Sequence, residues 1–270
     1  MGQGSLAGEP MKHQQEFIDV RGTKVELLRG GSGAPLLYLH GAGGEVAWLP
    51  FFDALAKDFT VYIPAHPGFS HSGSYDKIDS IHDLVFHYID LMEILKLDQP
   101  FVAGFSLGGW LAAEIAVHHP TRLRKMALID AVGIKVESAP IADIFAPAPP
   151  QARELFFYDP ESELAKTMVP DIPSPEMLEA FLRAREGTAR VGWNPYLFDP
   201  RLRERLYRVI APTLLIWGDS DRVVSLEHAK AYKEGIPHSK LSVLDKCGHC
   251  PPFEKPSETA ALIASFFKAQ

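Results

Sequence analysis

Two hydrophobic patterns alternate along this chain. Residues 15–29 alternate apolar and polar side chains around the turn Arg21-Gly22-Thr23, which is typical of an antiparallel hairpin. Continuous apolar runs predict buried strands, and apolar positions three or four residues apart predict helices. We expect strands at residues 35–40, 59–63, 101–105, 125–130, 212–217 and 240–244, and helices at 46–57, 81–96, 107–119, 225–235 and from 257 onward. This alternation of strands and helices predicts a parallel sheet.

The regular alternation stops between residues 132 and 208. Eight prolines fall between Pro140 and Pro175, mixed with apolar and acidic residues. The segment is too long and too apolar for an unstructured loop, so we interpret residues 132–208 as a mainly helical cap inserted into one core. The core then comprises residues 1–131 and 209–270, and residues 1–14 are expected to be disordered because they are rich in glycine and polar side chains.

Composition places the chain among ordinary globular proteins. Of its 270 residues 46% are hydrophobic and 23% are charged, and no apolar run reaches the ~20 residues that span a bilayer. The net charge of -7 argues against a nucleic-acid partner, because binding phosphates requires clustered Lys and Arg. The N-terminal residues lack the basic start and apolar stretch of a signal peptide. We therefore expect a cytoplasmic protein with a small-molecule substrate and no nucleic-acid or membrane partner, while composition carries no signal for oligomeric state.

The two cysteines, Cys247 and Cys250, form a Cys-x-x-Cys pair that flanks His249. Two cysteines are too few for a disulfide framework, and this number is typical of a reducing compartment. A structural zinc site needs a further pair of ligands at suitable spacing, and a redox motif opens a helix near the start of a βαβ unit. The sequence offers neither context, so we expect no metal and no cofactor.

A Gly-x-Ser-x-Gly motif runs from Gly104 to Gly108. It lies between a predicted strand and a predicted helix, where a nucleophile on a sharp strand-to-helix turn must stand. The flanking glycines fit such a turn, since side chains there would collide with the backbone. Ser106 is therefore the candidate nucleophile, the alternative being a glycine-rich turn without catalytic function. The backbone N–H of Leu107, unpaired at the start of the helix, is a candidate donor to a developing oxyanion.

A serine hydroxyl is a weak nucleophile and needs a base, which a carboxylate in turn orients. Among eleven histidines, His249 stands out because it follows the last predicted strand, at the sheet edge where the other active loops are expected. The loop after residue 217 offers Asp219 and Asp221, and Asp130 after an earlier strand is a third candidate. Either loop aspartate is also suited to cap the next helix or stabilise the turn. The chain order Ser, Asp, His is the order that the serine motif predicts.

Together these motifs give the chain a resemblance to the α/β-hydrolase family from about residue 15 to the end. The resemblance rests on His40-Gly41-Ala42-Gly43-Gly44 after an early strand, on the Ser106 motif, and on Gly218-x-x-Asp221 with Gly248-His249. It implies an α/β fold with a mostly parallel, eight-stranded sheet flanked by helices, and an inserted helical cap.

The resemblance also assigns roles to single residues. It selects Asp221 over Asp219 as the acid, because the family's acid stands three residues after the glycine. It gives Ala42 as the second oxyanion donor, with Gly43 as the alternative in this glycine-rich loop, and it implies a structural role for His40. The implied catalytic triad is Ser106, His249 and Asp221.

A serine nucleophile excludes the haloalkane dehalogenases and most epoxide hydrolases of the family, which attack with a carboxylate. Hydrolysis through an acyl-serine is left, and we expect a carboxylesterase or lactonase acting on a small organic substrate. The meta-cleavage-product hydrolases, which split carbon–carbon bonds, are similar in layout. They usually carry Asn before the nucleophile and Trp after the histidine, where this chain has Phe105 and Cys250. Four alternatives stay open: carbon–carbon cleavage of this kind, a thioesterase, a perhydrolase, and a non-catalytic ligand receptor on the same fold.

Aromatic residues of the cap are candidates for lining an apolar pocket or for the core of a small lid. We expect substrate contacts from Phe105 beside the nucleophile and from Trp193. Three arginines of the cap, Arg183, Arg185 and Arg190, are suited either to a substrate carboxylate or to a solvated helix face. The cap aromatics are Phe145, Phe156, Phe157, Phe181, Trp193 and Tyr196.

Overall fold

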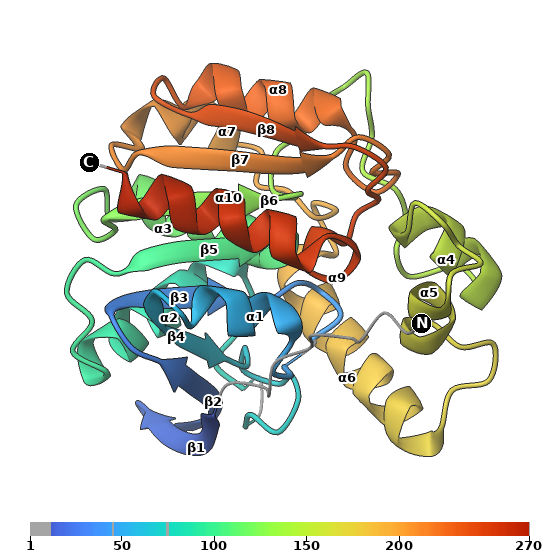
Figure 1. The fold of residues 1–270 in the computed structure, drawn as a ribbon, viewed down its shortest axis with the longest axis horizontal. Coiled ribbons are helices and arrows are strands. Elements are labelled where there is room, and N and C mark those ends of the chain that lie inside the picture. Colours follow the sequence, from blue (N-terminus) through green and yellow to red (C-terminus); the bar gives the residue numbers. More distant parts are fainter. Residues whose placement is uncertain (1–11, 45, 74–75, 270) are drawn as a thin grey trace, which may run out of the picture.

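The computed structural model describes residues 12–44, 46–73 and 76–269, and its strands form a single sheet (Figure 1). The strands are β1 (His13–Val20), β2 (Thr23–Gly31), β3 (Ala34–Leu39), β4 (Phe59–Pro64), β5 (Phe101–Phe105), β6 (Lys125–Ile129), β7 (Thr213–Gly218) and β8 (Lys240–Leu244). Their order across the sheet is β1-β2-β4-β3-β5-β6-β7-β8, and β2 runs antiparallel to both of its neighbours. The mostly parallel, eight-stranded sheet predicted from the sequence is confirmed.

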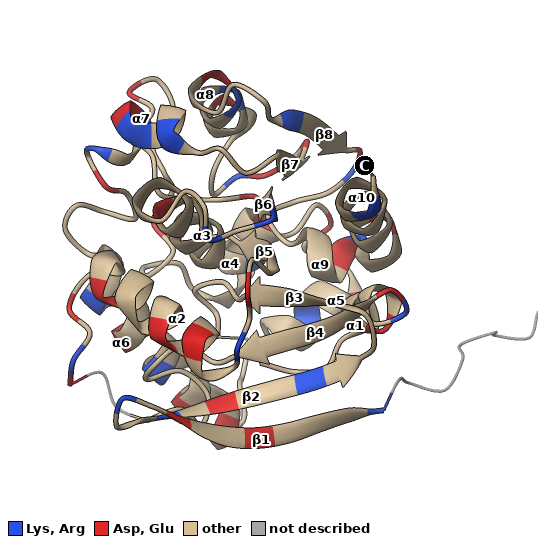
Figure 2. Ribbon diagram, turned by 90° about the vertical axis from the view of Figure 1, so that its left-hand side faces the viewer, with Lys and Arg blue, Asp and Glu red and all other residues tan. Residues whose placement is uncertain are grey.

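Helices cover both faces of this sheet (Figure 2). The helices α1 (Pro50–Leu55), α9 (Pro251–Glu254) and α10 (Pro256–Lys268) belong to one side. The helices α2 (Ile81–Ile94), α3 (Leu107–His118), α7 (Leu202–Arg205) and α8 (Leu226–Gly235) belong to the other. Each side has its own cluster of buried apolar side chains. Helix α3 is buried along nearly its whole length, which is expected of a helix that is apolar on all faces.

Two expectations near the N-terminus need correction. Residues 1–11 lie outside the described residues, but the expected disorder is wrong for His13 and Gln14, which pair with β2. The ring of His13 stacks on Trp48 at a centroid distance of 4.7 Å. The helix predicted at 46–57 is shorter, because α1 begins at Pro50, whose missing N–H and fixed φ suit the first helical position.

Between β6 and β7, three helices lie beside the carboxyl ends of the parallel strands: α4 (Pro149–Phe156), α5 (Glu163–Met168) and α6 (Pro175–Gly192) (Figure 1). By contrast α7 and the short 3-10 helix η1 (Leu206–Arg208) pack with α3 and α8. A bridge between Gly133 and Phe198 joins the two ends of this segment. We propose that α4, α5 and α6 form the cap, whereas α7 and η1 belong to the core.

No helix in the described part of the chain is long and apolar enough to cross a membrane.

Candidate active site

Ser106 lies on a sharp turn between β5 and α3. Its backbone has φ 50° and ψ -111°, which is a strained conformation for a residue with a side chain. The turn is so tight that a Cβ at Gly104 would lie 2.2 Å from the carbonyl oxygen of Gly108. A Cβ at Gly108 would lie 2.0 Å from the carbonyl oxygen of Leu39 in β3. Both glycines of the motif are therefore required for this turn to form.

The structure brings Ser106, His249 and Asp221 together in one hydrogen-bonded row. The Nε2 atom of His249 lies 2.9 Å from Oγ of Ser106, and its Nδ1 atom lies 2.8 Å from Oδ2 of Asp221. All three side chains are buried. When Nδ1 carries the proton and donates it to Asp221, Nε2 is free to accept the serine proton. The arrangement is therefore able to turn the hydroxyl into a nucleophile.

The two aspartates of the loop after β7 have different surroundings. The Oδ1 atom of Asp221 accepts hydrogen bonds from the backbone N–H groups of Val223 and Val224, which leaves Oδ2 for His249. Asp219 accepts hydrogen bonds from the hydroxyl of Ser220 and from the backbone N–H of Cys247. Asp219 therefore stabilises the turn, and Asp221 is the residue that contacts the histidine.

The third aspartate, Asp130, is fully buried next to Asp221. Its Oδ1 atom accepts a hydrogen bond from the backbone N–H of Gly218. Burial, together with the negative charge of Asp221, raises the pKa of Asp130 well above its usual range. Burial beside Asp221 therefore favours the protonated form of Asp130.

The loop that carries His249 is fixed by a partly buried carboxylate, which the sequence did not reveal. The Oε1 atom of Glu254 accepts hydrogen bonds from the backbone N–H groups of Gly248 and Cys250, and its Oε2 atom accepts one from Tyr158 between α4 and α5. The backbone N–H of His249 itself donates to the carbonyl of Phe156 at the end of α4. The position of the base thus depends on contacts with both the core and the cap.

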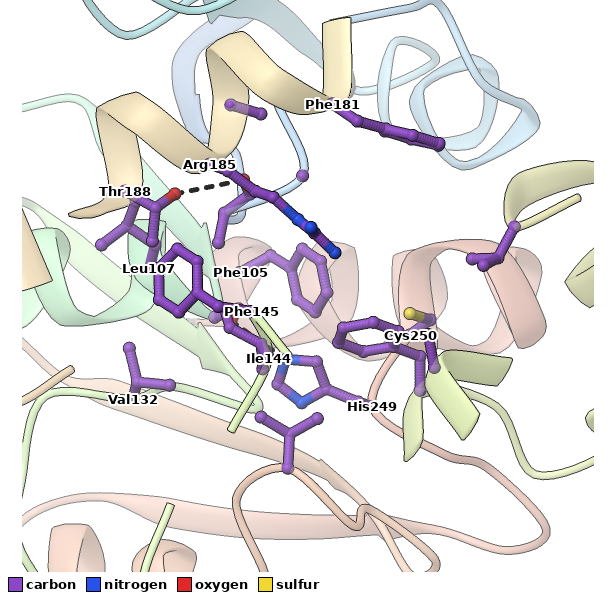
Figure 3. Close-up of a pocket in the computed structure, with 18 of the residues that line it drawn as sticks. Phe105, Leu107, Val132, Ile144, Phe145, Phe181, Arg185, Thr188, His249 and Cys250 are labelled. Atoms are coloured by element: carbon purple, nitrogen blue, oxygen red, sulfur yellow. Dashed lines mark hydrogen bonds between the residues drawn. The ribbon is translucent and has the colours of Figure 1, made fainter. Parts of the chain in front are cut away.

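The expected oxyanion donors stand on either side of the serine. Leu107 is the first residue of α3, where a backbone N–H has no acceptor within the helix. Ala42 and Gly43 follow β3 and line the same pocket as Ser106. The hydroxyl of Thr188 in α6 donates to the carbonyl of Ala42 at 3.2 Å (Figure 3), so a cap residue fixes the orientation of this loop.

His40 before this loop is buried, and both of its ring nitrogens are engaged. Its Nδ1 atom hydrogen-bonds the carbonyl of Gly41, and its Nε2 atom accepts the backbone N–H of His66. Burial lowers the pKa of His40 to about 4, so the ring is neutral. These contacts agree with a structural role.

The cavity above Ser106 has a volume of about 170 Å³ and is mainly apolar. Phe105, beside the nucleophile, lines it as expected, and the Phe105 ring lies 5.4 Å from that of His249. Trp193 does not line this cavity: it is 62% exposed and contacts Phe145 instead. Its place in the lining is taken by residues such as Thr188 and Ile144, which no sequence pattern singled out. Four cap aromatics do line the cavity: Phe145, Phe156, Phe157 and Phe181.

The three cap arginines have separate surroundings. Arg183 donates a hydrogen bond to the carbonyl of Ser72, and Arg190 pairs with Asp79, both outside the pocket. Arg185 reaches from α6 into the pocket (Figure 3). It is the only lysine or arginine among the described residues that line the cavity.

The two cysteines are buried and unlinked. Cys250 lines the pocket beside His249, whereas burial raises the pKa of the Cys247 thiol above its usual range. The Cys247 thiol is thereby kept protonated and weakly reactive.

Comparisons with known proteins agree with this architecture. The chain is 29% identical to the 2-hydroxy-6-oxo-6-phenylhexa-2,4-dienoate hydrolase of Comamonas testosteroni, over 88% of this chain and 89% of the relative. It is 27% identical to the 2-hydroxymuconate semialdehyde hydrolase of Pseudomonas sp. (strain CF600), over 92% of each. Among solved structures, a variant of the meta-cleavage product hydrolase from Pseudomonas fluorescens IP01 matches with a TM-score of 0.77 and 25% identity, covering 93% of this chain and 97% of that one.

A family model described as the alpha/beta hydrolase family matches residues 36–262. That range contains every strand from β4 to β8 and all three residues of the hydrogen-bonded row. The chain belongs to the alpha/beta hydrolase family.

Proposed function

We propose that this hydrolase uses Ser106, His249 and Asp221 to cleave a carbon–carbon bond next to a ketone, in a small substrate that carries a carboxylate. The observation that carries the proposal is Arg185. Arg185 is an exposed residue that lines a mainly apolar cavity, so its guanidinium gives one binding point for an anion, and the aromatic walls suit an apolar group at the other end.

The named relatives support the same substrate class. One is a hydrolase of a phenyl-substituted oxo-dienoate and the other of a muconate semialdehyde, and each of these names describes a conjugated carbonyl compound with a carboxylate. Two relatives of this kind match nearly the full length of the chain. For this reason we favour carbon–carbon cleavage over the simple ester hydrolysis that the sequence alone suggested.

The reaction would begin when His249 takes the proton of Ser106 and Oγ adds to the ketone carbon. The backbone N–H groups of Ala42 and Leu107 would stabilise the resulting oxyanion. When the carbonyl re-forms, the carbon–carbon bond breaks and its electron pair stays on the leaving fragment, which receives the proton held by His249. Water, activated by the same histidine, would then hydrolyse the acyl-serine and release a carboxylic acid.

Breaking a carbon–carbon bond requires a leaving carbanion that is stabilised. The keto tautomer of a hydroxy-dienoate provides this, because the electron pair left on the released carbon then spreads through the adjacent double bond to the carbonyl beside the carboxylate. A guanidinium at that end would bind the carboxylate and stabilise the developing enolate. Arg185 is suited to both tasks, which ordinary ester hydrolysis does not require.

Ester hydrolysis is the second candidate, and one observation favours it. Phe105 and Cys250, the neighbours of the nucleophile and base, are apolar where carbon–carbon hydrolases usually carry Asn and Trp. An ester has a good leaving group and does not need polar side chains that stabilise a carbanion. The same Ser106 chemistry would then act on an aryl or alkyl ester with an apolar acyl group.

The first experiment compares the native protein with Ser106→Ala on two substrates, a 2-hydroxy-6-oxo-dienoate and a p-nitrophenyl ester. Loss of the dienoate absorbance and release of nitrophenolate report the two reactions. We expect the native protein to turn over the dienoate and the variant to lose about 10³-fold or more in kcat. A protein that binds the dienoate but turns over neither substrate would instead act as a ligand receptor.

The second experiment tests the anion site with Arg185→Gln, using Arg190→Gln on the same helix as the matched control. Removing a charge-assisted hydrogen bond should lower kcat/KM for the dienoate by about ten- to a hundredfold. Activity on a neutral p-nitrophenyl ester should change little in either variant. Equal losses on both substrates would contradict a carboxylate-binding role for Arg185.

A further inference from the structure

A second cluster of ionisable side chains lies outside the pocket, where α2 and α3 meet the chain segment that follows α6. Two imidazoles and two carboxylates gather there, none of which lines the cavity above Ser106. Figure 2 shows α2, α3 and α7 side by side on this face of the molecule. The cluster consists of His82, Glu114, His118 and Asp199.

The central residue of this cluster is Glu114, whose side chain is fully buried at 0% exposure. Its Oε1 atom accepts a hydrogen bond from the indole Nε1 of Trp110 at 2.9 Å. Its Oε2 atom is buried and has no hydrogen-bond partner among the described residues. An uncompensated buried carboxylate oxygen is costly, so a ligand that binds this atom would be strongly favoured.

Two imidazole nitrogens face this oxygen at distances too long for hydrogen bonds. The Nε2 atom of His118 lies 3.6 Å from Oε2 of Glu114, and the Nε2 atom of His82 lies 4.0 Å from it. The same His82 nitrogen lies 3.4 Å from Oδ2 of Asp199. The ligand atoms of His82, Glu114 and His118 all lie within 4.8 Å of one another, and Asp199 lies beside His82.

These spacings match a metal centre better than a set of direct contacts. Ligand atoms around a tetrahedral zinc lie about 3.3 Å apart, because bonds of about 2.0 Å meet at the tetrahedral angle. The distances of 3.4, 3.6 and 4.0 Å are close to this value, and both imidazoles are partly exposed and able to adjust. Imidazole and carboxylate are also the donors that a divalent first-row metal such as zinc accepts.

We propose that His82, Glu114 and His118 bind a divalent transition-metal ion of the zinc type, with Asp199 beside His82 at the edge of the site. His118 stands one helical turn after Glu114 on α3, a spacing that places two ligands on one helix face. His82 comes from α2 and lies close enough to bridge α3 and Asp199. The partial exposure of the two histidines gives the ion a path from solvent.

One cation competes at the edge of this site. The Nη1 atom of Arg205 lies 3.5 Å from Oδ2 of Asp199, and the Oδ1 atom of Asp199 accepts the backbone N–H of Arg201. Asp199 is therefore shared between the metal site and Arg205. Arg205 also interacts electrostatically with Glu114 and His118, so a bound ion would compete with this guanidinium at all three residues.

A metal at this place would act on the structure and not on the reaction. Asp199 donates its backbone N–H to the carbonyl of Gly133, beside the bridge that joins both ends of the segment between β6 and β7. A metal that holds His82 in place would therefore also favour the contact of His82 with Asp199, at the returning end of that segment. The expected consequence is a more stable protein with unchanged chemistry at Ser106, so the proposal is independent of the function assigned above.

The test uses the full chain without a polyhistidine tag, stripped with a chelator and titrated with zinc in a calorimeter. His82→Ala and His118→Ala remove one ligand each from partly exposed positions, and His119→Ala is the matched control next to the site. We expect one zinc per native chain, at least about tenfold weaker binding in the two ligand variants, and native binding in the control. Zinc should also raise the melting temperature of the native protein and the control only.

Cobalt provides a second readout. The native protein loaded with Co²⁺ should show the visible absorption bands of a tetrahedral site, and Glu114→Gln should change them even if it binds the ion. Hydrolase activity should be the same with and without metal. Two results would overturn the proposal: a native chain that takes up no zinc, or zinc binding that is equally tight in the native chain, His82→Ala and His118→Ala.

Discussion

The two sides of the active site are built in different ways. On the sheet side Ser106, Asp221 and His249 are 6%, 7% and 3% exposed. The backbone N–H groups of Ser106 and Asp221 donate to carbonyls of the core, whereas that of His249 donates to Phe156 at the end of α4. On the cap side, α6 presents exposed apolar residues such as Leu178 and Leu182, at 48% and 58%, next to the pocket-lining Arg185. From this comparison we expect the buried core residues to set the chemistry and the more exposed cap to set substrate choice.

The largest expected effect separates the two loop aspartates of the core. Asp221→Asn keeps the size of the side chain but removes the charge that orients the imidazole, so kcat should fall by about 10³- to 10⁴-fold. Asp219→Asn is the matched control two residues away, and its kcat should fall by no more than about tenfold, because Asp219 contacts the turn and the backbone N–H of Cys247 but not the imidazole. Steady-state kinetics on both variants checks this. Similar losses in both would show that the loop, and not the carboxylate, matters.

An intermediate effect is expected where the two sides meet. Glu254 holds the loop of His249 and also the backbone of Tyr158 in the cap segment. Glu254→Gln replaces one acceptor oxygen with a donor, which should lower kcat by about tenfold through misplacement of the base. Glu258→Gln, on the exposed face of α10, is the control. A native kcat together with a lowered melting temperature would contradict the claim that Glu254 positions His249.

The smallest expected effect on activity concerns Asp130. Its pKa is raised in the folded state by burial and by the charge of Asp221. As pH rises, Asp130 therefore loses its proton in the unfolded state before it does so in the folded state. The contribution of Asp130 to the free energy of unfolding declines from about pH 4 upward, until the pKa of the folded state is passed. The side chain introduced in Asp130→Asn cannot ionise. The unfolding free energy of the variant minus that of the native protein should therefore increase with pH, while kcat stays native. Urea unfolding across this pH range measures the difference, and a difference that shrinks with rising pH would contradict the neutral state.

Much of the core was predictable because its signals are local. Buried strands are continuous apolar runs, and the Gly-x-Ser-x-Gly motif places a serine on a turn that tolerates only glycine at Gly104 and Gly108. The antiparallel hairpin around Arg21-Gly22-Thr23 is confirmed by the pairing of β1 with β2, but the first residues of β1, His13 and Gln14, were missed because their side chains are exposed and polar.

The cap was less predictable because its residues act through the packing of whole helices. Arg183, Arg185 and Arg190 look alike in sequence, and only the orientation of α6 sends Arg185 toward the pocket. Trp193 was expected to contact the substrate, but it lies on the outer side of the pocket wall, against Phe145. Glu254 was missed for a related reason, since its backbone partners lie in loops that come together only in the fold.

The most direct test of the proposed function measures kcat/KM of the native protein for a 2-hydroxy-6-oxo-dienoate and for a p-nitrophenyl ester with the same acyl group. Our account predicts that the dienoate is preferred by about a hundredfold or more, because Arg185 binds its carboxylate and stabilises its leaving enolate. A preference for the ester, with no detectable cleavage of the dienoate, would contradict carbon–carbon hydrolysis and identify the protein as an esterase.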